Sequence, residues 1–170
     1  MPTTMKLIAK TTLGSSASNI EFTSIPGTHT DLLVVCSLRT DRSGPSETVR
    51  LTLNGATTNY SERMLYGDGA GVASYSQSVA YLGATFCSAA QDTASTFGNA
   101  EIYIPNYAGS TNKSVTATSA SETNGSQAYI GAFAGLWSNT AAITTLRLSP
   151  VTGPNFVSGS SAFLYGITRA

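Results

Sequence analysis

The sequence has few of the side chains that carry out chemistry. Its 170 residues include nine Lys or Arg, nine Asp or Glu and a single histidine, His29. Hydrolases and transferases act through clustered acids, bases or metal ligands, and such clusters are hard to assemble from so few groups. We therefore expect no catalytic residue, no metal site, no cofactor and no enzyme activity. Hydroxyls, backbone amides and tyrosines remain, and they suit adhesion, assembly or sugar binding better than bond cleavage.

Charge of either sign is also scarce. Charged residues make up 11% of the chain and the formal net charge is zero, whereas a soluble domain usually has about 25% charged residues. Repulsion between monomers is therefore weak, and we expect the chain to associate with copies of itself. The alternative is a monomer solvated by its hydroxyls and amides. Because no basic stripe is present, nucleic acid is not an expected partner.

Long apolar segments are missing as well. The longest run, residues 32–36, is far shorter than the roughly 20 residues that cross a bilayer. The N-terminal MPTTMK carries one charge, and no hydrophobic segment follows it. We therefore expect no membrane partner and no secretory signal, and we place synthesis in a cytoplasm. The apolar fraction of 41% nevertheless supplies a core, which argues against a disordered linker.

Cysteine is limited to two residues, Cys36 and Cys87, both in apolar, strand-like runs. Two isolated cysteines without histidine neighbours make neither a zinc site nor a disulfide framework. We expect buried free thiols. A disulfide between the two would require their strands to be adjacent.

Strand and turn signals fill the chain, and no window has the 3.6-residue periodicity of a helix. We expect about ten or eleven short strands at the spacing of an all-β sandwich. Residues 31–40 (DLLVVCSLRT) are the strongest segment and indicate a central strand covered on both faces. The expected strands are residues 6–12, 20–25, 31–40, 49–53, 59–66, 79–86, 100–104, 115–119, 129–137, 146–148 and 162–167.

The fold that these segments predict is a two-sheet antiparallel β-sandwich of jelly-roll type, with a more open β-barrel as the alternative. Segments rich in Gly, Ser and Ala at residues 67–78, 88–96 and 108–111 are expected to be long loops. Residues 1–5 are expected to be a flexible arm, or a frayed terminus, ahead of a single domain at residues 6–170.

Few residues qualify as candidates for catalysis. His29 precedes Asp31 by two residues, but in an extended segment this spacing does not orient a relay to a serine. We interpret His29 as a turn residue. Paired carboxylates for glycosidic cleavage would have to come from Glu62, Asp68, Glu101 and Glu122, and nothing in the sequence brings them together. A calcium site at Asp68 lacks further acids nearby.

Aromatic residues give a better argument for binding. Tyrosines are spread over strands and loops, and Trp137 follows Leu136. Aromatic faces beside Asn and Ser hydroxyls suit sugar binding, while the same residues are enriched in protein interfaces and also pack in cores. A sugar site would be an exposed Tyr/Trp/Asn cluster built from residues 67–78 and Trp137. The tyrosines considered are Tyr60, Tyr66, Tyr75, Tyr81, Tyr103, Tyr107 and Tyr129.

Several sequence phrases resemble small virion proteins of tailed bacteriophages, over residues 6–167. Among them are NIEFTSIP, LTLNG, LYGDG, FGNAEIYIPNY, GLWSNTAAIT and the terminal LYGI. These phrases begin at residues 19, 51, 65, 97, 135 and 164, and shorter matches lie at residues 30–33 and 59–61.

The resemblance implies a β-sandwich of the kind found in head decoration, or cement, proteins and in tail-fibre modules, and it implies no catalytic residues. A chain of this length has no coiled-coil or β-helical shaft, which favours a decoration protein on the outer surface of the capsid. Its expected partners are the major capsid protein and copies of itself, as a homotrimer. The alternative is a tail-fibre or receptor-binding module that recognises host surface glycans.

Overall fold

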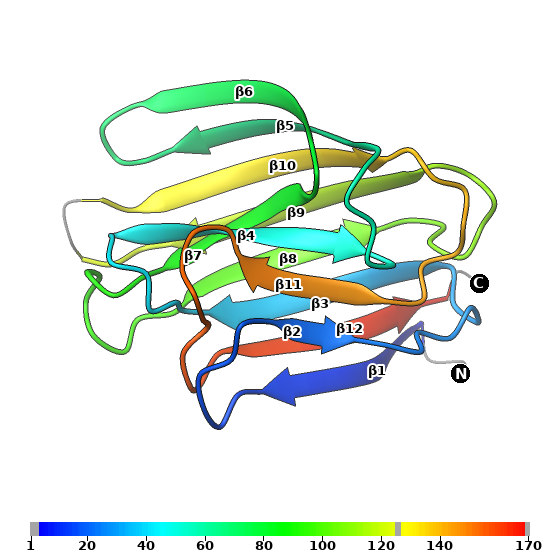
Figure 1. Cartoon of the computed structure of the whole chain (residues 1–170), viewed down its shortest axis with the longest axis horizontal. Coiled ribbons are helices and arrows are strands. Elements are labelled where there is room, and N and C mark those ends of the chain that lie inside the picture. Colours follow the sequence, from blue (N-terminus) through cyan, green and yellow to red (C-terminus); the bar gives the residue numbers. More distant parts are fainter. Residues whose placement is uncertain (1–3, 125–126, 169–170) are drawn as a thin grey trace.

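The computed structural model describes residues 4–124 and 127–168, which form twelve β-strands and contain no helix (Figure 1). The strands are β1 (Met5–Thr12), β2 (Ile20–Phe22), β3 (Asp31–Leu38), β4 (Ser46–Leu53), β5 (Tyr60–Gly67), β6 (Val72–Val79), β7 (Leu82–Ser88), β8 (Gly98–Ile104), β9 (Lys113–Ser121), β10 (Tyr129–Trp137), β11 (Leu146–Pro150) and β12 (Ser161–Ile167). With no helix in either described range, this part of the chain has no helix that could cross a membrane.

The strands form two antiparallel sheets that pack face to face. The large sheet has eight strands in the order β1-β12-β3-β8-β9-β10-β5-β6, and the small sheet has four in the order β2-β11-β4-β7. In Figure 1 the small sheet lies in front of the large one. The β-sandwich expected from the sequence is confirmed, while its jelly-roll topology stays a prediction.

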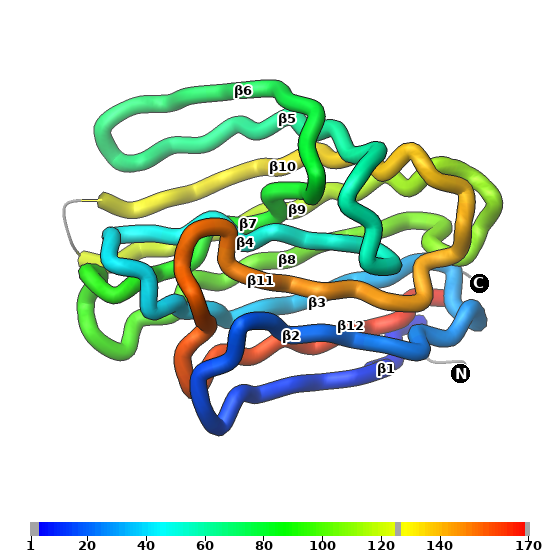
Figure 2. The backbone as a smooth tube through the Cα atoms, in the orientation of Figure 1, coloured from blue at the N-terminus to red at the C-terminus, as the bar shows by residue number. Residues whose placement is uncertain are grey.

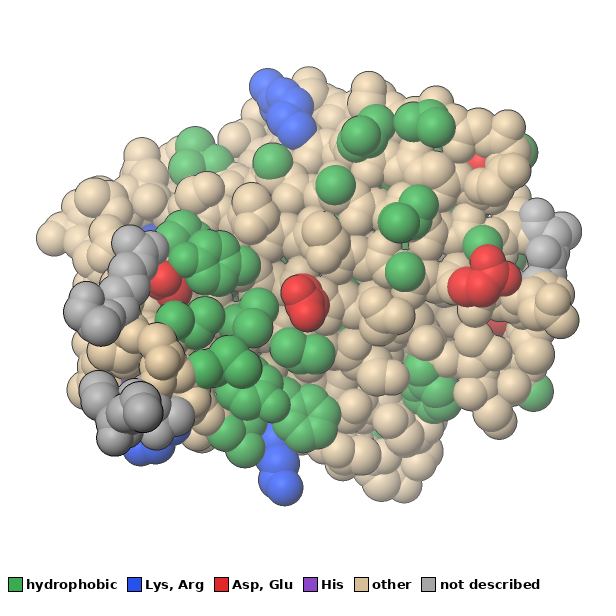
Figure 3. Space-filling model, turned by 180° about the vertical axis from the view of Figure 1, so that it is seen from behind, with side chains coloured by type: hydrophobic (Ala, Val, Ile, Leu, Met, Phe, Trp, Pro, Cys, Tyr) green, Lys and Arg blue, Asp and Glu red, His purple; other side chains and the backbone are tan. Residues whose placement is uncertain are grey.

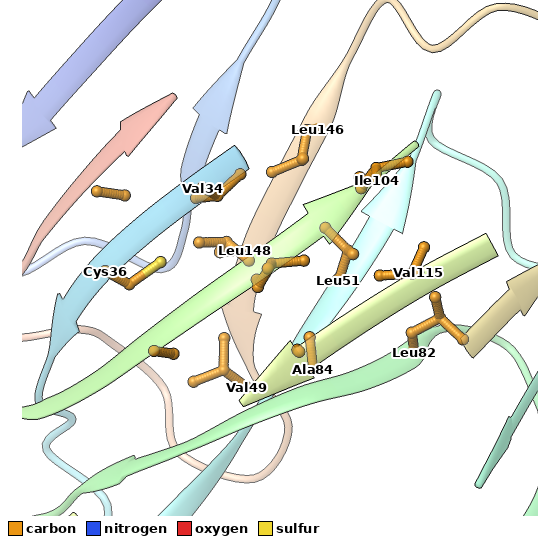
Figure 4. Close-up of a cluster of buried hydrophobic side chains, with 14 of the residues drawn as sticks. Val34, Cys36, Val49, Leu51, Leu82, Ala84, Ile104, Val115, Leu146 and Leu148 are labelled. Atoms are coloured by element: carbon orange, nitrogen blue, oxygen red, sulfur yellow. The ribbon is translucent and has the colours of Figure 1, made fainter. Parts of the chain in front are cut away.

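Alternating apolar residues build the core between the sheets. In β4, Val49, Leu51 and Leu53 are fully buried while the residues between them are partly exposed. These side chains meet those of the large sheet, such as Val34 and Ile104 (Figure 4). At about 25 cal/mol per Å² of apolar surface, this burial is the main stabilising contribution.

Two glycines in β10 let the sheets approach closely. A Cβ atom on Gly135 would lie 2.7 Å from Leu82 of β7, and one on Gly131 would lie 3.0 Å from Phe86. Real Cβ atoms essentially never lie closer than 3.0 Å to another residue's heavy atom, and a contact at 3.0 Å is already tighter than most. The space beside these two glycines is therefore filled by side chains of the small sheet.

The turn after β4 has the conformation that its Asn54-Gly55 sequence predicts. Asn54 and Gly55 both have positive φ, at 51° and 67°, which is the conformation that an Asn-Gly turn favours. The Asn54 side chain accepts hydrogen bonds from the backbone N–H groups of Thr144 and Thr145. This turn therefore also anchors the segment that leads into β11.

Two expectations about the strands are wrong, one at β6 and one at β3. Each of the eleven expected segments overlaps an observed strand, but residues 67–78 are not a long loop: they contain most of β6, which pairs with β5 in a hairpin. The expectation that β3 is covered on both faces is wrong, because Leu33 and Val35 on its outer face are only half-buried. Of the arm expected at residues 1–5, Met5 pairs with Ile167 in β1, and residues 1–3 lie outside the described residues.

Candidate functional site

The outer face of the large sheet has most of the exposed apolar side chains. Among the described residues, seven large hydrophobic side chains are exposed, and the ladder partners place all but Tyr75 on this face. Val72 is 77% exposed and Ile130 is 68% exposed. The other four are Met5, Leu7, Leu65 and Leu136. Contiguous exposed apolar surface on a small protein marks an interaction site.

One part of this face is the β12 patch, which lies where β1, β12 and β3 run side by side. Its exposed members are Met5 and Leu7, and its half-buried members are Leu33, Val35, Phe163, Tyr165 and Ile167. Ladder pairs place Leu7 beside Tyr165, and Tyr165 beside Leu33. The patch is the largest group of hydrophobic side chains in Figure 3, at the lower left.

The other part is the β10 groove, a shallow apolar depression of about 560 Å³ over β8, β9, β10, β5 and β6. Its lining is chiefly aliphatic, as at Leu65, Val72, Ile130 and Ala132, and also includes the polar side chains of Asn99, Glu101, Thr118 and Ser119. It carries no aromatic face of the kind on which a sugar stacks, apart from Tyr66 at its end. The groove therefore fits an apolar partner surface better than a carbohydrate.

Little charge interrupts these two areas. Of the strand residues described on this face, the charged and exposed ones are Lys10, Arg63 and Glu101. Glu101 lines the β10 groove from β8, the strand of the groove that lies next to the β12 patch. Asp31 is buried at the rim of the face, where it accepts hydrogen bonds from the Tyr103 hydroxyl at 2.8 Å and the Asn106 backbone N–H at 2.9 Å. A large sheet face with so few charges resembles the core of a protein interface.

The acids considered for catalysis are scattered. Glu62 is buried between the sheets, where it accepts hydrogen bonds from the Gln77 amide and the Gly83 backbone N–H, both at 2.5 Å. Asp68 lies in the β5–β6 turn, and the backbone N–H groups of Gly71 and Ala70 hold its pKa below the usual range. These two carboxylates satisfy backbone groups and do not face each other across a cleft.

The remaining candidates have local structural roles. Glu122 accepts a hydrogen bond from the Asn124 backbone N–H at 2.8 Å, and Glu101 lies on the open sheet face. His29 Nδ1 lies 3.0 Å from the Thr168 hydroxyl, and its ring covers Gly166 of β12. Nowhere in residues 4–124 and 127–168 do three His, Cys, Asp or Glu side chains gather as metal ligands would.

The aromatic cluster expected around Trp137 is not exposed. Trp137 is 2% exposed and stacks on buried Tyr60, with 6.1 Å between ring centroids. Because residues 67–78 form a hairpin rather than a loop, they do not join Trp137 in a common surface site. The prediction of an exposed sugar-binding cluster that contains Trp137 is therefore wrong in its residues. Tyr107 is also fully buried and donates a hydrogen bond to the Pro26 carbonyl.

Both cysteines are free and buried, as the sequence predicted. They belong to different sheets, since Cys36 lies in β3 and Cys87 in β7. Burial raises the pKa of Cys36 to about 12, and burial also raises the pKa of Cys87 well above its usual value. Both thiols therefore stay protonated and unreactive at neutral pH.

No protein-family model matches the chain, and no curated protein matches it either. The resemblance to phage virion proteins therefore rests on the sequence phrases alone.

Sequence reasoning missed the residues that now define the candidate site, namely Leu7, Leu65, Val72 and Ile130. One signal was available in β10. Its outward positions are Ile130, Ala132, Ala134 and Leu136, and its inward positions are also apolar or glycine. A strand that is apolar on both faces has two partners, and the small sheet supplies only one of them.

Proposed function

We propose that this chain is a non-catalytic structural subunit that docks through the outer face of its large sheet onto the shell of a tailed-phage capsid, as a decoration or cement protein. The observation that carries the docking proposal is the concentration of exposed apolar side chains on that face. The identity of the docking partner, the major capsid protein, rests on the sequence resemblance.

The proposed mechanism is passive stabilisation. The β12 patch and the β10 groove would cover apolar surface at the junctions of capsid subunits, and each Å² of apolar surface removed from water contributes about 25 cal/mol. Many weak contacts repeated over a shell give strong retention, because each bound subunit holds its neighbours in place. The few charges on this face reduce the desolvation cost of docking.

The docking proposal is tested on shells assembled without this chain. Ile130→Glu places a charge in the β10 groove, and Thr52→Glu places the same charge on the small sheet, opposite Arg147. Wild type and Thr52→Glu should saturate shells at equal concentrations. Ile130→Glu should bind about tenfold or more weakly, since tenfold corresponds to ~1.4 kcal/mol. Equal binding by Ile130→Glu, or no binding by wild type, would contradict the proposal.

Counting copies in purified particles tests the location. A decoration protein should remain on heads from which the tails have been removed, in a number close to that of the shell's symmetry-related sites. Loss of the chain together with the tails would favour the alternative, a receptor-binding module for host glycans. That alternative stays a prediction without an exposed Trp137 to support it.

A further inference from the structure

The two sheets end in four edge strands, and three of these are protected against pairing with another chain. An unprotected edge exposes a row of backbone N–H and C=O groups, so proteins shorten it, charge it, bend it or cover it. The edges are β1 and β6 in the large sheet and β2 and β7 in the small sheet. Their differences indicate which edge is open to a partner.

The first two edges carry the common protective devices. In β1 the register shifts between Leu7 and Ala9, and the lysines Lys6 and Lys10 are both exposed. A bulge and two charges disfavour the approach of a second strand. The edge strand β2 is only three residues long, and its exposed residue, Glu21, forms an ion pair with Arg147 at 3.1 Å.

The third edge, β7, is covered by the large sheet. Its Gly83 backbone N–H donates to Glu62 Oε2 at 2.5 Å, and its Phe86 backbone N–H donates to Ser119 Oγ at 3.0 Å. All seven residues of β7 are buried. Side chains of the facing sheet therefore occupy the positions that another strand would take.

The fourth edge, β6, has none of these devices. It has eight residues, Val72–Val79, with no charge and no proline, and its ladder with β5 runs without a register shift from Tyr60–Val79 to Gly67–Val72. Seven of its residues are exposed, because the hairpin extends beyond the small sheet (Figure 2). The strand is long, has no bulge and is exposed along most of its length.

We propose that β6 pairs antiparallel with β6 of a second copy of this chain, which joins the two large sheets into one continuous sheet. A strand edge is complementary to its own copy across a two-fold axis perpendicular to the sheet. That axis keeps the outer face on one side, so outward residues meet outward residues. The outward residues of β6 are Val72, Ser74, Ser76 and Ser78, since they pair with the outward residues of β5.

Small uncharged side chains favour this occupant. In such a pairing serines meet serines or Val72, so no like charges oppose each other across the junction. The chain as a whole has zero formal net charge, so long-range repulsion between copies is absent. The two β10 grooves would then lie on the same face, on either side of the joined strands, because Val72 lines each groove. The pairing does not depend on a capsid and can be tested on the isolated protein.

The test adds the protective device that β6 lacks. Ser74→Lys combined with Ser78→Lys places lysines along this edge, and Ser114→Lys combined with Thr116→Lys adds the same charge to exposed positions of β9 in the middle of the same face. Mass is measured by sedimentation equilibrium. Wild type and the β9 variant should have twice the chain mass of 17.6 kDa, and the β6 variant should have the single mass.

Three outcomes would overturn the proposal: a monomeric wild type, a trimer of the kind expected from the sequence, or a dimer that the β6 lysines leave intact. A denaturation curve checks that both variants are folded. Failure of shell binding with an intact β6 dimer would contradict only the docking proposal, so the two are separable.

Cross-linking locates the contact. If outward residues pair and the two β6 strands overlap over most of their length, Ser76 of one copy lies opposite Ser74, Ser76 or Ser78 of the other. A Ser76→Cys variant should therefore give a covalent dimer with a short thiol cross-linker, and Ser114→Cys should not. The native Cys36 and Cys87 are buried and give little background. Equal cross-linking of both variants, or of neither, would contradict the β6 contact.

Discussion

The outer faces of the two sheets differ in their chemistry although both belong to one sandwich. On the small sheet, Arg147 forms a two-point contact with Glu21, and Arg50 lies 5.0 Å from the centre of the Tyr81 ring. On the large sheet, exposed aliphatic side chains such as Leu65 and Ile130 lie among outward serines and threonines, and few of the outward residues are charged. The small sheet has the polar outer face that a solvated sheet needs. The large sheet carries exposed aliphatic side chains instead, and under the proposed docking a partner surface would cover them.

The largest expected effect is a difference in stability loss between substitutions on the two faces of β10. Phe133→Ala should lower the free energy of unfolding by about 3–5 kcal/mol, because Phe133 is buried with its ring 5.4 Å from that of Phe86. The matched change Ile130→Ala, three residues away on the exposed side of β10, should alter it by no more than about 0.5 kcal/mol. Urea denaturation of the isolated protein measures both. Similar losses at the two positions would mean that the outer face is already covered in solution.

A smaller effect on stability is expected from the thiol of Cys36, which is buried in the core between the two sheets. The pKa of Cys36 is about 12 in the folded chain and 9.0 in an ordinary thiol. Between these values the unfolded chain releases the proton and the folded chain retains it, so stability is fully present below pH 9 and falls as pH rises toward 12. Wild type should therefore lose more stability than Cys36→Ala over this range. Denaturation midpoints at a series of alkaline pH values measure the difference, and parallel curves would contradict the burial of this thiol.

The smallest effect is expected on the small sheet. Arg147→Ala removes an ion pair whose side chains are 49% and 30% exposed, and such pairs contribute about 0–1 kcal/mol. The variant should unfold at nearly the wild-type urea concentration and should bind shells as wild type does. A loss of shell binding would move the docking face to the small sheet and reverse the comparison.

Much of the fold could be predicted from the sequence because core strands require alternation. Val49, Leu51 and Leu53 identified β4, and Asn54-Gly55 identified its turn, since only these residue types satisfy burial on one face and positive φ in the turn. The free thiols of Cys36 and Cys87 were predicted for the same reason, because both lie within apolar runs.

The strand β6 could not be recognised in this way. Its sequence, VASYSQSV, has little apolar character because neither face packs on the small sheet. It is a strand because its backbone pairs with that of β5. The sequence of β6 alone does not reveal this pairing. Trp137 was misplaced for the opposite reason: the sequence does not say toward which sheet a side chain in an all-apolar strand points. Because β10 is apolar on both faces, its sequence revealed neither the burial of Trp137 nor the β10 groove.

The strand order also imposes a sequence of events on synthesis. β12 lies between β1 and β3, and β11 lies between β2 and β4, so each sheet has an empty second position until residues 146–167 emerge from the ribosome. The pairings that then form link opposite ends of the chain, as in Met5 with Ile167, and such long-range contacts form late and slowly. Phe163 and Tyr165 of the β12 patch arrive with that last strand. A chain interrupted before residue 146 would therefore lack both a closed sandwich and three of the seven side chains of the β12 patch.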